Sequence, residues 1–292
     1  MLSDRIIRGV TEDGFVRFYG LDFKDLMIKA QEIHNLSTTN SVIFGRLLGA
    51  GLIMGSDLKS DKDLITIRVN SDGIANGTIV TANGRGEIKG FVPKPKVELP
   101  LKDGVIDVKS GVGEGTLTII KDLGLKNPYN GTVELLYGEI AADITHYYTQ
   151  SEQIPTAMGL GVLVFPNGEI KQAGGFMIQL LPGADESIIK KIEDNLMRFP
   201  NLTDMLDIGH SIEDLIKTYI LKGMNPTIKN SSSVEYKCDC SRERFSRVLA
   251  TLGKFELEEA IEDQGEIEVN CHFCNSRYKY DKAFVKSIID NM

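Results

Sequence analysis

The sequence contains no tryptophan and only four histidines, and its four cysteines all lie after residue 237. The first three histidines, His34, His146 and His210, are too scattered to indicate a catalytic set, so they are interpreted as ordinary histidines. We therefore predict no catalytic residues and do not expect an enzyme. The confinement of every cysteine to one short segment calls for a local explanation.

The sequence also lacks a long hydrophobic run. Its most apolar stretch, 42–54, contains Arg46 and is too short to cross a bilayer. The glycines in this stretch recur at small-residue spacing, which indicates a closely packed, buried helix. The polar start at 1–5 leads to no apolar core of signal-peptide length. We therefore expect no membrane partner and a cytoplasmic protein, in a compartment where thiols stay reduced.

Positive charge is in the minority, with 33 Lys and Arg residues against 41 Asp and Glu residues and a net charge of −8. Phosphate backbones require a positive protein surface, so nucleic acid is not expected to be the main partner. The 292 residues are enough for more than one domain, and the apolar fraction of 42% is enough for a sizeable core.

Residues 1–183 are predicted to form one α+β core domain of mixed sheet and helix, because strand-like and helix-like segments do not alternate regularly. The strand-like segments are rich in β-branched residues, and they lie at 6–10, 15–19, 64–69, 77–80, 115–120, 159–165 and 175–181. Helices are expected at 21–36, 41–54 and 138–148. The dipeptides Asn83-Gly84 and Asn130-Gly131 predict hairpin turns.

Residues 184–233 are predicted to form a metastable helical linker. Apolar residues recur on one helical face at 188–196 and again at 212–219, and Ser211 with Asp214 fits a capping box. The stretch 225–233 is interpreted as a loop, because it contains Asn225-Pro226 and a run of serines. Short helices are marginal alone, so this segment should depend on a partner that holds it in place.

Residues 234–292 are predicted to form a small zinc-binding domain. The segment has expected helices at 241–252, near 257 and at 282–290, and strands at 267–270 and 277–280. The ligand pattern is Cys-x-Cys followed, thirty residues later, by Cys-x-x-Cys, and it comprises Cys238, Cys240, Cys271 and Cys274. Two thiol pairs on separate loops are typical of a tetrahedral zinc site. A domain this small needs such support to fold.

Other interpretations of these residues fit less well. The flanks of Cys271 do not resemble a thioredoxin-like strand and helix, and no His-x-Glu signature precedes it. The position of His272 inside the Cys-x-x-Cys loop argues against a ligand role. A zinc ribbon that contacts nucleic acid or protein without redox switching stays an alternative. Arg242, Arg244 and Arg247 would make the nucleic-acid contacts, although 234–292 holds nine Lys and Arg against twelve Asp and Glu.

Enzyme-like patterns in the core are also weak. The run 111–115 is rich in glycine, but it lacks the Gly-Lys-Ser/Thr ending of a phosphate loop and precedes a strand. Asp143, His146 and Glu152 could form an acid/base group only in a geometry that the sequence does not fix. A helix surface explains these three residues as well.

The Cys-x-Cys spacing indicates redox sensitivity. Two cysteines one residue apart close only a small, strained disulfide ring, and strained disulfides are the labile, regulatory kind. An oxidant that takes one thiolate to a sulfenic acid would let a neighbouring thiol close a disulfide. The metal would then lose its ligands.

Four stretches resemble a known family. The run 236–244 (Tyr-Lys-Cys-Asp-Cys-Ser-Arg-Glu-Arg), with 271–275 (Cys-His-Phe-Cys-Asn) and Tyr278 after it, is similar to the cysteine motif of the 33 kDa chaperonin family of redox-regulated heat-shock chaperones. The runs 147–156 and 174–183 resemble signatures of that family's core domain. The resemblance covers nearly the whole chain, and the four cysteines show no departure from it.

The resemblance implies a mechanism. The reduced form, with one Zn²⁺ per chain, would be inactive. Oxidation would form two disulfides, Cys238–Cys240 and Cys271–Cys274, release zinc and unfold the C-terminal domain and the linker. The exposed apolar surface would then hold unfolding client proteins without ATP, in a form that is a homodimer in this family.

Overall fold

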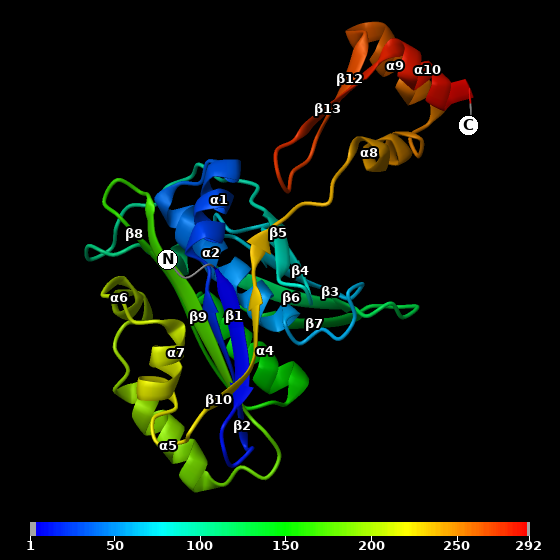
Figure 1. The fold of residues 1–292 in the computed structure, drawn as a ribbon. Coiled ribbons are helices and arrows are strands. Elements are labelled where there is room, and N and C mark those ends of the chain that lie inside the picture. The colour runs from blue at the N-terminus through cyan, green and yellow to red at the C-terminus, as the bar shows by residue number, and fades with distance from the viewer. Residues whose placement is uncertain (1–3, 291–292) are drawn as a thin grey trace. The chain divides into compact units, whose positions relative to one another are not determined.

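The computed structural model describes residues 4–290, apart from the side chain of residue 264, so the first three residues of the polar start and the last two residues lie outside the described part. The chain mixes helices and sheets, which confirms the α+β class. It divides into two compact units (Figure 1). Unit 1 ends at Tyr236 and unit 2 begins at Lys237.

Unit 1 contains two sheets. The five-stranded sheet has the order β10-β1-β2-β9-β8, with β1 (Arg5–Val10), β2 (Val16–Asp22), β8 (Thr156–Val164), β9 (Ile170–Leu180) and β10 (Thr227–Ser233). The six-stranded sheet has the order β11-β5-β4-β3-β6-β7, with β3 (Leu64–Ser71), β4 (Ile79–Asn83), β5 (Glu87–Phe91), β6 (Gly115–Asp122), β7 (Tyr129–Glu134) and β11 (Glu235–Tyr236). Neighbouring strands are antiparallel except that β11 is parallel to β5.

The helix α2 (Thr38–Gly55) is the centre of the main core. Ser37 begins it by accepting a hydrogen bond from the Asn40 N–H, and nearly every residue along it is buried. A Cβ atom on Gly45 would lie 2.6 Å from Val162 of β8, and one on Gly51 would lie 2.9 Å from Ile88 of β5. The glycines therefore let the helix approach both sheets closely, which confirms the closely packed, buried helix predicted for this stretch. No helix within residues 4–290 is long and apolar enough to cross a membrane.

The other helical elements of the N-terminal part surround this core. They are α1 (Lys24–His34), α3 (Val108–Val112), α4 (Ile140–Tyr147) and the π-helical turn η1 (Tyr148–Glu152). The turn predicted at Asn83-Gly84 lies between β4 and β5 as expected. The turn predicted at Asn130-Gly131 is wrong, because both residues lie within β7 and pair with β6. Here the pairing with a long neighbouring strand overrides the local preference of the dipeptide.

Residues 186–220 form a second apolar cluster on the five-stranded sheet. The elements are α5 (Glu186–Met197), α6 (Leu202–Asp207), α7 (Ile212–Asp214) and the π-helical turn η2 (Leu215–Ile220). Their buried side chains, such as Leu206 and Ile216, pack with Phe18 and Ile178 of the sheet. The capping box of Ser211 and Asp214 is present as predicted. These elements pack within unit 1, and their role as a separate linker stays a prediction.

The loop predicted at 225–233 is wrong for most of its length, because β10 runs through it and pairs with β1. The strand has an unfavourable composition (Thr-Ile-Lys-Asn-Ser-Ser-Ser) and mostly exposed side chains. It forms because β1 offers an unpaired edge of hydrogen-bonding groups, which no local pattern in β10 reveals. Gly9 allows the approach, since a Cβ atom there would lie 2.1 Å from the Thr227 carbonyl oxygen.

Unit 2 is a small α+β unit. It contains α8 (Arg242–Leu249), α9 (Lys254–Gln264), the hairpin of β12 (Glu266–Asn270) and β13 (Arg277–Asp281), and α10 (Lys282–Asp290). These bounds agree with the expected elements to within a few residues. Ser241 begins α8 by accepting a hydrogen bond from the Arg244 N–H at 3.1 Å. The buried core of this unit is one small cluster formed by Leu249, Leu257, Ile261, Tyr280, Val285 and Ile289.

Candidate metal centre

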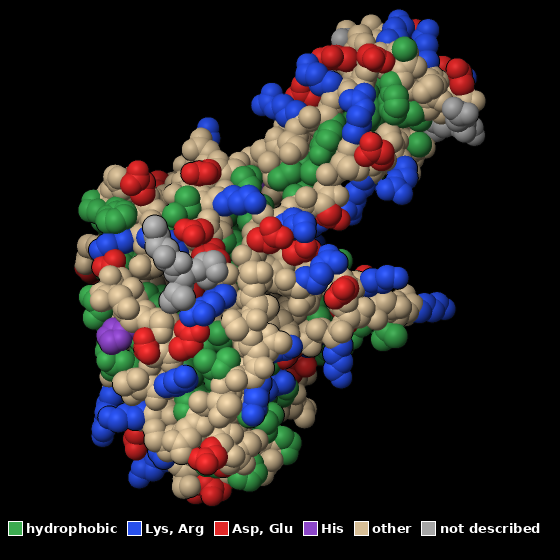
Figure 2. Space-filling model, in the orientation of Figure 1, with side chains coloured by type: hydrophobic (Ala, Val, Ile, Leu, Met, Phe, Trp, Pro, Cys, Tyr) green, Lys and Arg blue, Asp and Glu red, His purple; other side chains and the backbone are tan. Residues whose placement is uncertain are grey.

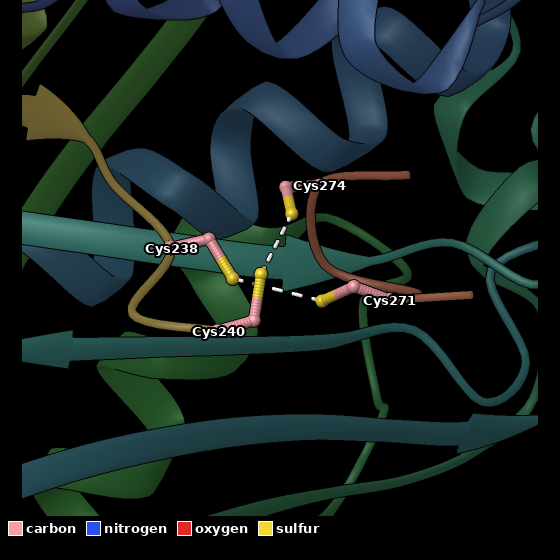
Figure 3. A group of neighbouring side chains, drawn as sticks. All are labelled: Cys238, Cys240, Cys271 and Cys274. Atoms are coloured by element: carbon pink, nitrogen blue, oxygen red, sulfur yellow. Dashed lines mark hydrogen bonds between the residues drawn. The ribbon is translucent and has the colours of Figure 1, made fainter. Parts of the chain in front are cut away.

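Two loops of unit 2 carry the cysteines. The first loop joins β11 to α8 and holds Cys238 and Cys240. The second loop connects β12 to β13 and holds Cys271 and Cys274. We refer to these four residues as the four-cysteine cluster. All four side chains point toward one centre in Figure 3. The structure thus brings together every residue that the sequence predicted as a metal ligand.

The second loop is a tight turn held by its own backbone. The Cys271 carbonyl accepts hydrogen bonds from the N–H groups of Cys274 at 3.3 Å and Asn275 at 2.7 Å. The Cys271 N–H donates to the Ser276 carbonyl at 2.9 Å, which closes the loop. Asn275 has a φ of 56°, in the left-handed region that asparagine tolerates better than most residues. This turn aims both sulfurs of the loop in the same direction.

The sulfur positions fit a tetrahedral ion. The Sγ atoms of Cys238 and Cys271 are 3.7 Å apart, those of Cys240 and Cys274 are 3.3 Å apart, and all four lie within 4.8 Å of one another. A tetrahedron with metal–sulfur bonds of about 2.3 Å has sulfur–sulfur edges of about 3.8 Å. The cysteines are free thiols, and the separations exceed the roughly 2 Å of a disulfide bond. The donor set and its spacing therefore suit Zn²⁺.

The thiols differ in their electrostatics. Burial raises the pKa of the Cys238 thiol, and hydrogen bonds to neighbouring thiols add to that effect. Burial likewise raises the pKa of Cys271. At Cys274 burial also acts to raise the pKa, but hydrogen bonds with Ser276 and with the other thiols outweigh it and lower the pKa to about 7. A bound divalent cation would favour the thiolate form of all four residues.

Two neighbours contact the sulfurs of the cluster, and the sequence predicted neither contact, although Tyr278 belongs to the motif that carries the family resemblance. The Tyr278 hydroxyl lies 3.2 Å from Cys240 Sγ, and the Ser276 hydroxyl lies 3.2 Å from Cys274 Sγ. Tyr278 reaches the sulfur because β13 pairs with β12, which brings residue 278 beside the first loop. No spacing rule in the sequence reveals this contact, because it depends on the register of the hairpin.

The arginines that follow the first loop contribute to the internal packing of unit 2. Arg242 lies over the rings of Tyr280 and Phe284, at 4.6 and 5.3 Å from their centroids, and its guanidinium donates to the Lys279 carbonyl. Arg244 forms an ion pair with Asp239. Figure 2 shows Lys and Arg side chains interspersed with Asp and Glu over the visible face. These contacts give no specific support to the nucleic-acid alternative.

The remaining candidate residues are not gathered into a site. His272 is exposed and does not belong to the group within 4.8 Å. His34 is buried against Tyr236, whereas His146 and His210 contact the rings of Tyr137 and Tyr219. The histidines therefore lie in separate environments, as the sequence indicated.

The other enzyme-like patterns have structural roles. Asp143 accepts a hydrogen bond from the Tyr137 N–H, and burial raises the pKa of its carboxyl group. Glu152 binds Lys121 and the Tyr147 hydroxyl. The glycine-rich run 111–115 contains the end of α3 and the start of β6, so it opens a strand as expected and not a helix.

Comparisons with known proteins agree on one family. A family model described as "Hsp33 protein" matches residues 4–281. A protein named 33 kDa chaperonin from Clostridium perfringens (strain SM101 / Type A) is 43% identical, over 99% of this chain and 92% of its own length. A protein of the same name from Clostridium botulinum (strain Langeland / NCTC 10281 / Type F) is 40% identical, over 99% and 98% of the two chains.

A solved structure gives the same result. The crystal structure of the 33 kDa chaperonin (heat shock protein 33 homolog) from Thermotoga maritima is similar to this chain, with a TM-score of 0.90. The two sequences are 30% identical, and the match covers 99% of each chain. The similarity therefore extends over both compact units.

Proposed function

This chain belongs to the Hsp33 protein family, whose members are named 33 kDa chaperonins, and we propose that it is a chaperone switched on by oxidation of the four-cysteine cluster. In its reduced, zinc-bound form it is inactive. In its oxidised form it holds unfolding proteins without ATP and prevents their aggregation. We propose that it works in the cytoplasm and that its active form is a homodimer.

The observation that supports the switch is the convergence of four sulfurs from two loops on a unit with a very small core. A structural zinc ion bound by such ligands contributes on the order of 10 kcal/mol of apparent binding free energy, which becomes folding free energy. Cys238 and Cys240 would hold it from one side and Cys271 and Cys274 from the other. The fold of unit 2 then depends on thiolates, which oxidants attack.

The proposed oxidation forms one disulfide within each loop, Cys238–Cys240 and Cys271–Cys274, as the family resemblance implies. In each step two thiolates lose two electrons and form an S–S bond. Hypochlorous acid takes the two electrons and one proton, and it leaves as chloride and water. Neither disulfide joins the two loops, so the link between them that the four thiolates supported is lost. Unit 2 should then unfold.

Unfolding of unit 2 would reach the predicted linker at 184–233. The first cysteine follows Tyr236 by two residues, and β10 and β11 are the elements that precede it. The helical elements from α5 to η2 bury apolar side chains such as Ile216 and Leu206 against the five-stranded sheet. Their release would expose this apolar cluster. Exposed apolar surface binds other exposed apolar chains, which is the property that a holding chaperone requires.

The test compares the reduced protein with the same protein treated with hypochlorite. We expect the loss of one zinc and four free thiols per chain, and the appearance of aggregation suppression for a heat-unfolded test enzyme. Reductant with zinc should reverse all three changes. A variant with Cys238→Ser and Cys240→Ser lacks two of the four ligands, so it should suppress aggregation already when reduced and show no further gain on oxidation. Equal suppression by the reduced and oxidised wild-type protein would contradict the proposal.

A further inference from the structure

The strand β8 lies at one edge of the five-stranded sheet, and no further strand pairs with its outer side in the part of the chain that the structure describes. Four strands end the two sheets of unit 1, namely β10, β8, β11 and β7. Three of them are short or carry a charge: β10 contains Lys229, β7 contains Glu134, and β11 has two residues. β8 has nine residues (Thr-Ala-Met-Gly-Leu-Gly-Val-Leu-Val) and no charge or proline. Soluble proteins normally protect edge strands with charged residues, proline or short length. An edge strand without these features indicates a surface that binds another chain.

The register shows which backbone groups face outward. The Leu180 N–H donates to the Pro155 carbonyl, so these two residues form a hydrogen-bonded pair. Hydrogen-bonded and non-hydrogen-bonded pairs alternate along an antiparallel ladder. Residues 157, 159, 161 and 163 therefore bond to β9, and the N–H and C=O groups of Met158, Leu160 and Val162 point away from it. Within residues 4–290, the structure gives these outward groups no hydrogen-bond partner.

A groove of about 880 Å³ runs beside this edge. Its floor is formed by residues 159–165 of β8 and the loop after it. One wall is formed by parts of the segment 98–108, with the exposed side chains of Leu101 and Val105, and the other by residues 199–204. An extended strand advances about 3.3 Å per residue, and a groove of this size admits a segment of several residues.

The charges of the groove favour one kind of occupant. Its charged lining residues are Arg46, Glu98 and Asp204. Arg46 is already paired with Glu139, and the Glu98 carboxylate accepts hydrogen bonds from the N–H groups of Thr38 and Thr39. The lining is otherwise mostly apolar and has an excess of carboxylates. Aggregation-prone segments of proteins combine an apolar, β-prone run with charged flanking residues. A segment with Lys or Arg flanks would match the groove in both respects.

We propose that the groove beside β8 binds an extended, apolar segment of an unfolding protein as an additional strand of the five-stranded sheet. The identity of the occupant rests on the proposed chaperone function, whereas the binding mode rests on the edge itself. A second copy fits less well, because its own β8 lies between the same two walls. The wall at 199–204 belongs to the predicted linker, so oxidation should open the groove and strengthen binding.

The test uses the full chain and a fluorescent octapeptide of alternating valine and threonine with a lysine at each end. Hydrogen exchange should slow at least about tenfold at the amides of Met158, Leu160 and Val162 when the peptide binds. The amides at 157, 159 and 161 should change little, since they are already bonded to β9. Peptide binding that leaves the three outward amides unprotected, in both reduced and oxidised protein, would overturn the proposal.

Two variants locate the site. Leu160→Pro removes one outward N–H and leaves the β9 ladder intact, and it should weaken peptide binding at least about tenfold. Leu101→Lys places a positive charge in the wall that repels the lysines of the peptide, so it should also weaken binding, and it is used if the proline variant does not fold. The matched control is Leu125→Lys, because Leu125 is 69% exposed and Leu101 is 63% exposed, but Leu125 lies outside the groove. Equal effects of Leu101→Lys and Leu125→Lys would contradict the site.

The outcomes separate this inference from the proposed function. Protection of the outward amides in either redox state supports the inference, even if aggregation suppression does not change on oxidation. A gain of suppression without that protection supports the function and overturns the binding mode. Slow exchange of the same amides in the protein alone, together with dimerisation that Leu160→Pro abolishes, would show that a second copy is the occupant.

Discussion

At the scale of single residues, the grouping of the four cysteines could be predicted from the sequence, but the hydroxyl groups beside them could not. Paired cysteines at short spacing have few other uses, so they could be proposed as metal ligands without a structure. Tyr278 and Ser276 contact the cluster only because the hairpin places them there. A tyrosine or serine near a cysteine in sequence is common, and its position relative to the sulfur is set by strand pairing.

Tyr278→Phe should make Cys240 easier to oxidise. The hydroxyl at 3.2 Å can donate to the Cys240 thiolate, and a hydrogen bond of this kind withdraws charge from the sulfur. We expect the oxidation rate of Cys240 to increase about threefold, which corresponds to ~0.6 kcal/mol, the lower end of a net hydrogen bond. Thiol trapping with mass spectrometry after timed exposure to peroxide measures it.

Tyr280→Phe is the control for this effect. Its hydroxyl donates to the Arg242 carbonyl at 2.7 Å and does not contact a sulfur. The control variant weakens the packing of unit 2 without changing the environment of Cys240. If both variants oxidise equally fast, the acceleration reflects loosening of unit 2, and the Tyr278 hydroxyl has no specific effect.

At the scale of elements, local patterns identified strands and helices with a clear apolar periodicity. They missed strands that are stabilised mainly by pairing with another strand. The buried helix α2 and the amphipathic α10 have clear patterns, and both were predicted. β10 and β11 have none, because their serines and short length give no apolar periodicity. They exist through pairing with β1 and β5. Sequence alone cannot reveal an element whose stability comes from a partner distant along the chain.

Tyr236→Phe should destabilise unit 1 through β11. The Tyr236 hydroxyl accepts from the Gly90 N–H at 3.1 Å, donates to the Gly90 carbonyl at 3.0 Å and lies 2.8 Å from His34 Nε2. Phenylalanine keeps the ring but leaves these buried groups without the hydroxyl. We expect the free energy of unfolding of unit 1 to fall by about 1–3 kcal/mol, measured by urea denaturation.

Tyr137→Phe is the matched control, because Tyr137 is 51% exposed. Removal of an exposed hydroxyl should change stability by less than about 0.5 kcal/mol. A Tyr236→Phe protein as stable as this control would show that the hydroxyl does not anchor β11.

At the scale of the whole molecule, the sequence indicated a large core and a small cysteine-dependent end, and the structure has two compact units. The predicted boundaries at 183 and 233 remain predictions, because the helical elements from α5 to η2 pack within unit 1 in this state. A segment that is folded in one state and released in another has no fixed boundary in a single structure. Composition can indicate marginal stability, but not where the release stops.

Metal removal should act on unit 2 and the predicted linker and leave the core around α2 folded. With thiols kept reduced, a strong zinc chelator should abolish the slow amide exchange of β12 and β13, while β3 and β6 stay protected in the larger core. The reason is the contrast between the six buried residues of the unit 2 cluster and the extensive core around α2. Reductant without chelator is the control. Unchanged protection of β12 and β13 in the metal-free protein would show that unit 2 folds by itself.

The position of β1 has a consequence for solubility in the open state. β1 lies between β2 and β10, so departure of β10 would turn it into an outer strand. Its sequence includes Arg5 and Arg8, and strands bordered by cations repel further copies of themselves. The proposed open form would bind unfolding chains, and it must not assemble into fibres of its own copies. Arg5 and Arg8 would therefore let β10 leave β1 without assembly of the protein into fibres through the exposed β1 edge.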